Sequence, residues 1–190
     1  MKVLIIPEDP TLDAHILQPI VERLFEDIGR KARIEVLQDP HLNGIDQALN
    51  PDMVRRIVDE NPMVDLFLLM VDRDCNRFQN EAKVTAREQE HSGRLLACVA
   101  IEEVEVWMLA LHRESLGERW NAIRSDCDPK ERYAEPFLRE QGWLSQVGKG
   151  RKRAMRGLSA QWKSLLTVCP ELTTLRERLQ GWSAHPPESR

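Results

Sequence analysis

The stretch DLFLLMVDRD (residues 65–74) decides the fold of this chain, because it joins an unbroken apolar run to two aspartates. Six apolar residues in succession, 66–71, are typical of a strand that is buried on both faces, as in a parallel sheet. Asp72 and Asp74 follow where this strand is expected to end. Residues i and i+2 of an extended chain point the same way, so the two carboxylates are predicted to lie together.

Outward from this stretch, the first 110 residues alternate between apolar runs and segments with helical periodicity. Asn50 is placed to cap a helix whose first residue is Pro51. Strands separated by helices imply parallel pairing and helices on both faces. We therefore expect an α/β fold with a mainly parallel four-stranded sheet flanked by helices. The expected strands are 2–6, 32–37, 65–71 and 94–101, and the expected helices are 12–28, 51–60, 76–91 and 102–112.

The rest of the chain differs in pattern and in charge. Residues 1–140 carry 28 acidic against 18 basic residues, a net charge of −10, whereas residues 141–190 carry 3 against 9, a net charge of +6. We expect an α/β core over 1–116 and a helical, basic extension over 117–190 that packs on it, with helices at 158–167 and 171–181. An acidic body with one basic end suits a polyanionic partner that touches a single face.

Composition and missing motifs narrow the possible functions. No apolar stretch approaches the ~20 residues of a membrane span, and the start of the chain does not fit a signal peptide. The four cysteines show no metal-binding spacing, so we expect reduced thiols in the cytoplasm. A Gly-rich phosphate loop and a G-x-S-x-G elbow are both missing from the sequence, which argues against an ATPase, a dinucleotide enzyme and a serine hydrolase. If the function of this protein requires nucleotide hydrolysis, a partner ATPase would have to supply it.

Acidic residues follow three of the expected strands. Glu8 comes after the first strand, Asp72 and Asp74 after the third, and three glutamates after the fourth: Glu102, Glu103 and Glu105. The working crevice of an open α/β sheet lies beyond the carboxyl ends of its strands, so these groups are expected to meet. Each group alone can equally be a turn former, a helix cap or a complement to a helix dipole.

A shared cation would offset the repulsion between so many carboxylates. Several carboxylates within a few Å repel one another unless a cation joins them, and oxygen-only ligands favour Mg²⁺ or Mn²⁺. Such ions activate water and neutralise a phosphodiester. The predicted metal ligands are Glu8, Asp72, Asp74, Glu103 and Glu105.

The order of these acids resembles the Toprim domain of topoisomerases, primases and OLD-type nucleases, which has a Rossmann-like fold. The segment EEVEVWMLALH (102–112) and the loop PEDPTLD (7–13) are similar to those of small stand-alone Toprim-like proteins of bacterial defence systems, including the RloB group. The resemblance covers about residues 1–112. Asp9 stands where the family usually has glycine, which argues against nucleotidyl transfer of the primase kind.

The resemblance implies a role for each matching acid. Glu8 would be the general acid or base or a metal ligand, and Asp72 and Asp74 the metal-binding pair. Glu105, with Glu103 or Glu102, would complete the site, so Glu8, Asp72, Asp74 and Glu105 are the predicted catalytic residues. Asp13 would be the second acid of the first loop.

The basic end is the candidate nucleic-acid interface. Five cations lie in eight residues, and such clusters bind phosphate backbones without sequence preference: Lys149, Arg151, Lys152, Arg153 and Arg156. We therefore expect a Mg²⁺-dependent nuclease or phosphodiesterase of bacterial defence. The alternatives are a catalytically inactive Toprim-like sensor or subunit, and a plain α/β interaction protein. The sequence leaves open the choice of DNA, RNA or a small phosphoester, and the oligomeric state.

Overall fold

The sheet of this protein has four strands, all of them parallel. The computed structural model describes residues 1–184, apart from the side chain of Arg77. The strand order is β2-β1-β3-β4, which confirms the predicted α/β fold and parallel pairing. The strands are β1 (Lys2–Ile6), β2 (Arg33–Val36), β3 (Leu66–Asp72) and β4 (Leu95–Ala100).

β3 is central, and every residue from Leu66 to Val71 is buried. Its side chains alternate between two separate hydrophobic clusters. Leu66 and Leu68 belong to one cluster, and Phe67 and Leu69 belong to the other. Burial on both faces is the physical reason for the unbroken apolar run.

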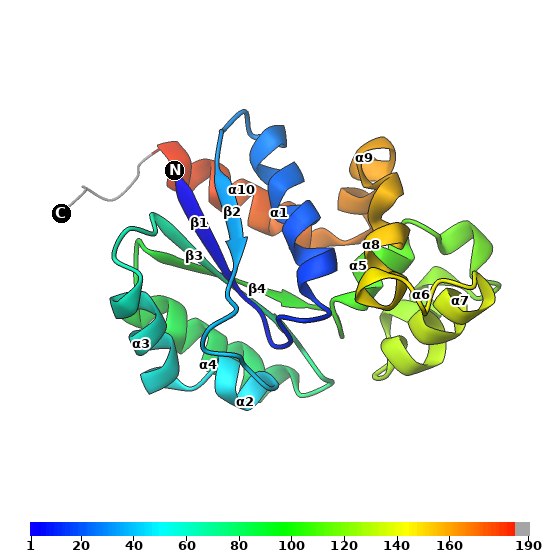
Figure 1. Cartoon of the computed structure of the whole chain (residues 1–190), viewed down its shortest axis with the longest axis horizontal. Helices are drawn as coiled ribbons and strands as arrows, with labels where there is room; N and C mark the ends of the chain where they lie inside the picture. Colours follow the sequence, from blue (N-terminus) through cyan, green and yellow to red (C-terminus); the bar gives the residue numbers. More distant parts are fainter. Residues whose placement is uncertain (185–190) are drawn as a thin grey trace.

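Helices cover both faces of the sheet (Figure 1). On one face lie α2 (Ile45–Ala48), α3 (Pro51–Glu60) and α4 (Arg77–Glu90), whose apolar residues pack with one cluster. α3 begins as predicted, since the Asn50 side chain accepts a hydrogen bond from the Met53 backbone N at 3.0 Å. On the other face lie α1 (Ala14–Asp27), α5 (Glu105–Ala110), α9 (Leu158–Val168) and α10 (Pro170–Ala184).

The segment after α5 consists of short helical pieces that share the core of the sheet. Phe137, Trp162 and Leu175 belong to the same hydrophobic cluster as Val3 of β1. Residues 185–190 of the expected extension lie outside the described part of the chain. The short pieces are η1 (Arg113–Ser115), α6 (Trp120–Arg124), η2 (Lys130–Ala134), α7 (Glu135–Glu140), η3 (Val147–Gly150), α8 (Arg151–Ala154) and η4 (Met155–Gly157).

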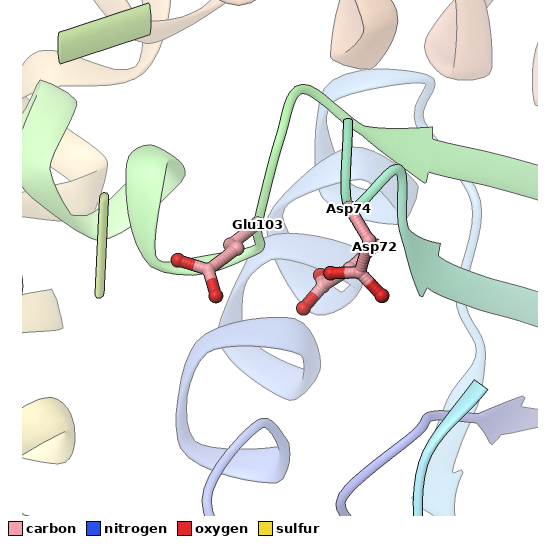
Figure 2. Close-up of side chains that lie close together, drawn as sticks. All are labelled: Asp72, Asp74 and Glu103. Atoms are coloured by element: carbon pink, nitrogen blue, oxygen red, sulfur yellow. The ribbon is translucent and has the colours of Figure 1, made fainter. Parts of the chain in front are cut away.

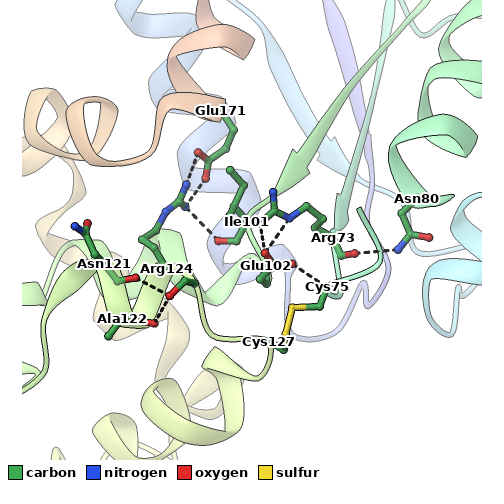
Figure 3. A network of polar contacts seen from close by, with 11 residues as sticks. Arg73, Cys75, Asn80, Ile101, Glu102, Asn121, Ala122, Arg124, Cys127 and Glu171 are labelled. Atoms are coloured by element: carbon green, nitrogen blue, oxygen red, sulfur yellow. Dashed lines mark hydrogen bonds and ion pairs between the residues drawn. A yellow bond between two sulfur atoms is a disulfide. The ribbon is translucent and has the colours of Figure 1, made fainter. Parts of the chain in front are cut away.

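Glu171, near the start of α10, ties this segment to the core. Its carboxylate accepts hydrogen bonds from the Trp107 indole at 2.7 Å and from the Arg124 guanidinium at 2.7 and 2.9 Å. Arg124 also donates to the carbonyl of Ile101, immediately after β4 (Figure 3). The polar contacts thus hold α5, α6 and α10 against the end of β4.

Two features of the fold bear directly on function. Within residues 1–184, no helix is both long enough and apolar enough to cross a membrane. In addition, α5 begins at Glu105, although the pattern predicts a helix from residue 102. Glu102 and Glu103 therefore belong to the loop after β4 and not to the first helical turn.

Candidate metal centre

Three loops bring their carboxylates together at the carboxyl edge of the sheet. Oxygens of Asp72, Asp74 and Glu103 all lie within 4.8 Å of one another (Figure 2). Glu8, after β1, adjoins this cluster, because its Oε1 accepts a hydrogen bond from the Asp72 backbone N at 2.6 Å. The predicted meeting of the acids after β1, β3 and β4 is thus observed for these four residues. We call Glu8, Asp72, Asp74 and Glu103 the acidic cluster.

The topology explains this position. The strand order is β2-β1-β3-β4, so the connection that leaves β1 runs outward to β2, whereas the connection that leaves β3 runs in the opposite direction to β4. A crevice opens at such a point, and ligands of open α/β sheets bind there. Glu8 and Asp72 flank this crevice directly.

The loop after β3 has an unusual backbone. Asp74 and Cys75 have φ values of 52° and 50°, in the left-handed region that side chains other than glycine rarely adopt. Asp72 and Asp74 do lie together, as predicted. The reason given for it, an extended chain in which both side chains point the same way, is wrong, because the backbone at Asp74 is left-handed. A residue in this conformation costs on the order of 1–2 kcal/mol, so neighbouring groups must hold the loop in place.

Glu102 provides most of this support (Figure 3). Its carbonyl accepts from the backbone N of Arg73 at 2.8 Å, and its carboxylate accepts from the backbone N of Cys75 at 2.8 Å and from the Arg73 guanidinium. Burial alone would raise the pKa of Glu102, but these hydrogen bonds outweigh it and lower the pKa. Glu102 is thus a positioning residue for Asp72 and Asp74 and does not belong to the acidic cluster.

A disulfide between Cys75 and Cys127 closes the same loop. The prediction of four reduced thiols is wrong for these two residues, while Cys98 and Cys169 are free and buried. The two bonded cysteines are 52 residues apart in sequence and meet only because α6 and the following loop pack against the end of β4. No local spacing could have indicated this pair.

Asp72 and Glu103 are both oriented by backbone donors. Oδ1 of Asp72 accepts from Val104 N at 2.9 Å, and Oε2 of Glu103 accepts from Lys130 N at 2.7 Å. The Lys130 side chain is half-buried and interacts with Glu103 and Glu105, which raise its pKa against the effect of burial. Sequence reasoning missed Lys130, since nothing near residue 130 indicates that η2 begins beside the acidic cluster.

Burial and mutual repulsion destabilise the charged form of these carboxylates, so positive charge nearby stabilises the acidic cluster. Burial, followed by the charges of neighbouring acids, raises the pKa of Glu8 to about 8 and that of Asp72 well above its usual range. Burial likewise raises the pKa of Glu103 to about 7 and raises that of Asp74. Carboxylates held this way are neutralised by protons or by a cation.

Asp13 also lies close to the acidic cluster. It is buried, its Oδ2 accepts from Asp9 N at 3.0 Å, and burial with the charge of Glu105 raises its pKa to about 7. The Asp9 carboxylate turns back on its own loop, where Oδ1 accepts from the backbone N of Thr11 at 2.7 Å and of Leu12 at 3.1 Å. Asp9 thus acts as the turn former that its sequence context also allows.

Glu105 does not join the carboxylates that lie close enough to share an ion. Its Oε1 pairs with Arg151, at 2.6 Å from Nη2 and 3.2 Å from Nε, and both side chains are almost fully buried. The expectation that Arg151 lies on a basic surface is wrong for the same reason. A buried glutamate needs a partner, and this one finds its partner 46 residues along the chain.

The other cations of the basic segment remain on the surface. Lys149, Lys152, Arg153 and Arg156 are exposed, and the Arg153 guanidinium lies 4.9 Å from the centre of the Trp143 ring. The segment adjoins the acidic cluster through the Glu105–Arg151 pair.

The donor set fits a hard divalent cation. Carboxylate oxygens are the ligands that Mg²⁺ and Mn²⁺ prefer, and three of them within reach of one point leave positions for water and substrate. The fold and the acidic cluster therefore define an α/β protein with a candidate metal centre at the carboxyl edge of a parallel sheet. The chain matches no protein-family model, no curated protein and no solved structure.

The pKa values of the acidic cluster predict how stability depends on pH. The pKa of Glu8 is about 8 in the folded protein against an ordinary 4.5, so the folded protein binds more protons than the unfolded chain between these values. The metal-free protein should therefore lose stability as the pH rises, by about 5 °C in Tm from about pH 5 to pH 8. Mg²⁺ should restore most of this loss at about pH 8 and have little effect at about pH 5, because bound carboxylates must be deprotonated.

Thermal unfolding in EDTA and in Mg²⁺, followed across this pH range, measures both effects. A Tm that does not respond to Mg²⁺ at the upper end would contradict the assignment of a metal centre.

Proposed function

We propose that this protein is a Mg²⁺- or Mn²⁺-dependent phosphodiesterase that cleaves nucleic acid. The single observation that carries the proposal is the convergence of Asp72, Asp74 and Glu103 within 4.8 Å, beside Glu8, at the crevice of the sheet. When bound there, a divalent ion would polarise the phosphodiester and lower the pKa of a water molecule.

The residues of the chain would then position the ion and move protons. Asp72, Asp74 and Glu103 would bind the ion. Hydrolysis adds one water across a P–O bond, so one proton leaves the attacking water and one joins the leaving oxygen. Glu8 is the candidate to accept the first proton, since its carboxylate lies beside Asp72 and is not one of the three carboxylates that would share the ion. The Lys130 ammonium, which lies beside Glu103, is the candidate to neutralise the leaving oxygen.

The basic segment would hold the nucleic-acid backbone. Lys149, Lys152, Arg153 and Arg156 are exposed, and the buried Glu105–Arg151 pair ties their segment to the start of α5, two residues after Glu103, so phosphates held along these cations would lie in the neighbourhood of the acidic cluster. Arg151 would act only by positioning this segment, because it is buried.

The wider setting of the proposal follows the sequence resemblance. A Toprim-like protein of bacterial defence would work in the cytoplasm, where invading nucleic acid is found, and would depend on a partner ATPase for any nucleotide-driven step. The alternative from the same resemblance is an inactive sensor or subunit that uses the ion for structure alone.

A cleavage assay distinguishes the proposed nuclease from the inactive sensor or subunit. The full-length protein is incubated with plasmid, single-stranded DNA and RNA in Mg²⁺, in Mn²⁺ and in EDTA, beside the variants Asp72→Ala/Asp74→Ala and Asp59→Ala. Asp59 is an exposed carboxylate near the end of α3, so its variant is the matched control.

We expect cleavage that requires the metal, persists in Asp59→Ala and is lost in the double variant. Metal-dependent stabilisation without cleavage of any substrate would favour the inactive alternative. Cleavage that survives in the double variant would contradict the proposed site.

A further inference from the structure

A pocket of about 380 Å³ adjoins the acidic cluster on the side of β2. Glu8 belongs to both, because it is one of the residues that line the pocket and its Oε1 accepts the hydrogen bond from the Asp72 backbone N. The pocket lies between the loop after β1 and the loop after β2, with a single residue contributed by η3. The lining residues that matter here are Glu8, Thr11, His41, Leu42, Asn43 and Lys149.

One hydrogen bond joins the two loops, and another holds the loop after β2 in shape. The Gly44 backbone N donates to the Glu8 carbonyl at 3.2 Å, and the Asn43 backbone N donates to Gln47 Oε1 at 3.0 Å. Leu42 is almost fully buried and supplies an apolar floor, whereas His41 and Asn43 are exposed at the rim. The pocket is thus formed before any ligand arrives.

Lys149 reaches the pocket because of a tight turn. Gly148, Lys149 and Gly150 have φ values of 62°, 49° and 88°, which glycine adopts readily at the first and third positions. A β-carbon on Gly148 would collide with the His15 ring, and one on Gly150 would lie 2.7 Å from the Trp143 β-carbon. The two glycines let the turn pack against the His15 ring and against the backbone and β-carbon of Trp143, so they form a defined turn.

The lining has the chemistry of a nucleotide site. An imidazole can stack on a base, an amide and a hydroxyl can reach the polar edge of a base, and an ammonium can meet a phosphate. Pockets that hold small ligands measure roughly 300–1,000 Å³, so this one has room for a nucleoside but not for paired strands. A base inside a duplex would have to leave its stack to enter.

We propose that this pocket binds one unpaired base of the substrate, next to the phosphate that the acidic cluster receives, and so selects single-stranded nucleic acid. The inference rests on the proposed function for the position of that phosphate. His41 stacks on the base, and Lys149 contacts the adjoining backbone. Duplex binds only through its phosphates.

Binding measured without cleavage tests this inference. The probe is a fluorescein-labelled decamer of adenine nucleotides, single-stranded or annealed to its complement, titrated with the full-length protein in Ca²⁺. The integrity of the probe is checked on a gel. We expect the single strand to bind about tenfold more tightly than the duplex, which is the range of one base–aromatic stack.

Variants identify the pocket as the source of this preference. His41→Ala should weaken single-strand binding about tenfold and leave duplex binding unchanged, whereas His41→Phe should keep the preference because it keeps a ring that can stack. Lys149→Ala should weaken both probes. Lys31→Ala, at an exposed lysine just before β2 and therefore at the opposite edge of the sheet, should weaken neither.

Equal affinity for the two probes, or a His41→Ala variant that binds the single strand as tightly as the wild type, would overturn the inference. The same variants in the Mg²⁺ cleavage assay distinguish this failure from failure of the proposed function. Cleavage that needs Asp72 but shows no preference for single strands overturns the pocket alone. A His41-dependent preference in a protein that cleaves nothing supports the pocket and overturns the nuclease.

Discussion

Asp72→Asn is expected to slow metal-dependent cleavage about a thousandfold, the largest effect of any single substitution in this protein. The change keeps the shape of the side chain and an oxygen that can accept from Val104 N, as Oδ1 does now at 2.9 Å. It removes one carboxylate of the shared ion site and keeps the backbone N that donates to Glu8. A metal ion contributes several kcal/mol to the transition state, and each 1.36 kcal/mol is tenfold in rate.

The same variant should not unfold the protein. Burial raises the pKa of Asp72 well above its usual range, so a neutral amide is tolerated there at least as well as the charged carboxylate. In EDTA at about pH 8 the Tm of Asp72→Asn should equal or exceed that of the wild type, and Mg²⁺ should no longer raise it. Asp59→Asn, on the surface, should match the wild type in every measurement.

Single-turnover cleavage rates and thermal unfolding, measured on the same preparations, check both statements. A variant that cleaves at the wild-type rate would show that Asp72 is only a turn residue. A variant that loses both activity and stability would assign it a structural role instead.

Glu105→Gln is expected to destabilise the fold by about 3–5 kcal/mol, because it leaves the Arg151 guanidinium buried without its counter-charge. Arg151 is fully buried, and its Nη1 has no hydrogen-bond partner within the described residues, so the carboxylate of Glu105 is the group that compensates its charge. For a chain of this size the loss amounts to roughly 10 °C in Tm. Arg151→Met alone should destabilise the fold by a similar amount, since it leaves the Glu105 carboxylate buried without its counter-charge.

The double variant Glu105→Gln/Arg151→Met should recover most of this loss. Removing one member of a buried ion pair is costly, but replacing both by neutral side chains of similar size is often nearly neutral. Arg156→Met, an exposed arginine five residues further on, should change the free energy of unfolding by less than about 0.5 kcal/mol.

Urea unfolding of the wild type, the two single variants and the double variant gives the coupling energy between Glu105 and Arg151, and Arg156→Met serves as the control. Single variants as stable as the wild type, or a double variant that loses the full sum of both, would contradict the pairing. Mg²⁺-dependent stabilisation that is retained in Glu105→Gln at low temperature would agree with the placement of Glu105 outside the acidic cluster.

Much of the fold was predictable because its signals are local. The apolar run 66–71 marks a strand buried on both faces, and Asn50 with Pro51 marks a helix start that the structure confirms. Once strands and helices alternate, parallel pairing follows, and parallel pairing places every loop after a strand at one edge. This reasoning led from Glu8, Asp72 and Asp74 to a common site without any knowledge of their distances.

The sequence by itself thus determined the α/β order, the parallel sheet and the edge at which its acids gather, because strand burial and connection rules depend on neighbours in the chain. Only the tertiary structure decided which glutamate faces the acidic cluster. α5 starts at Glu105, so Glu103 points to the aspartates, Glu102 turns back to Arg73, and Glu105 meets Arg151. The disulfide of Cys75 and the place of Lys130 likewise depend on segments far apart in sequence. Local periodicity carries no information about such partners, because charge pairing and burial are set by whichever surfaces the whole fold brings into contact.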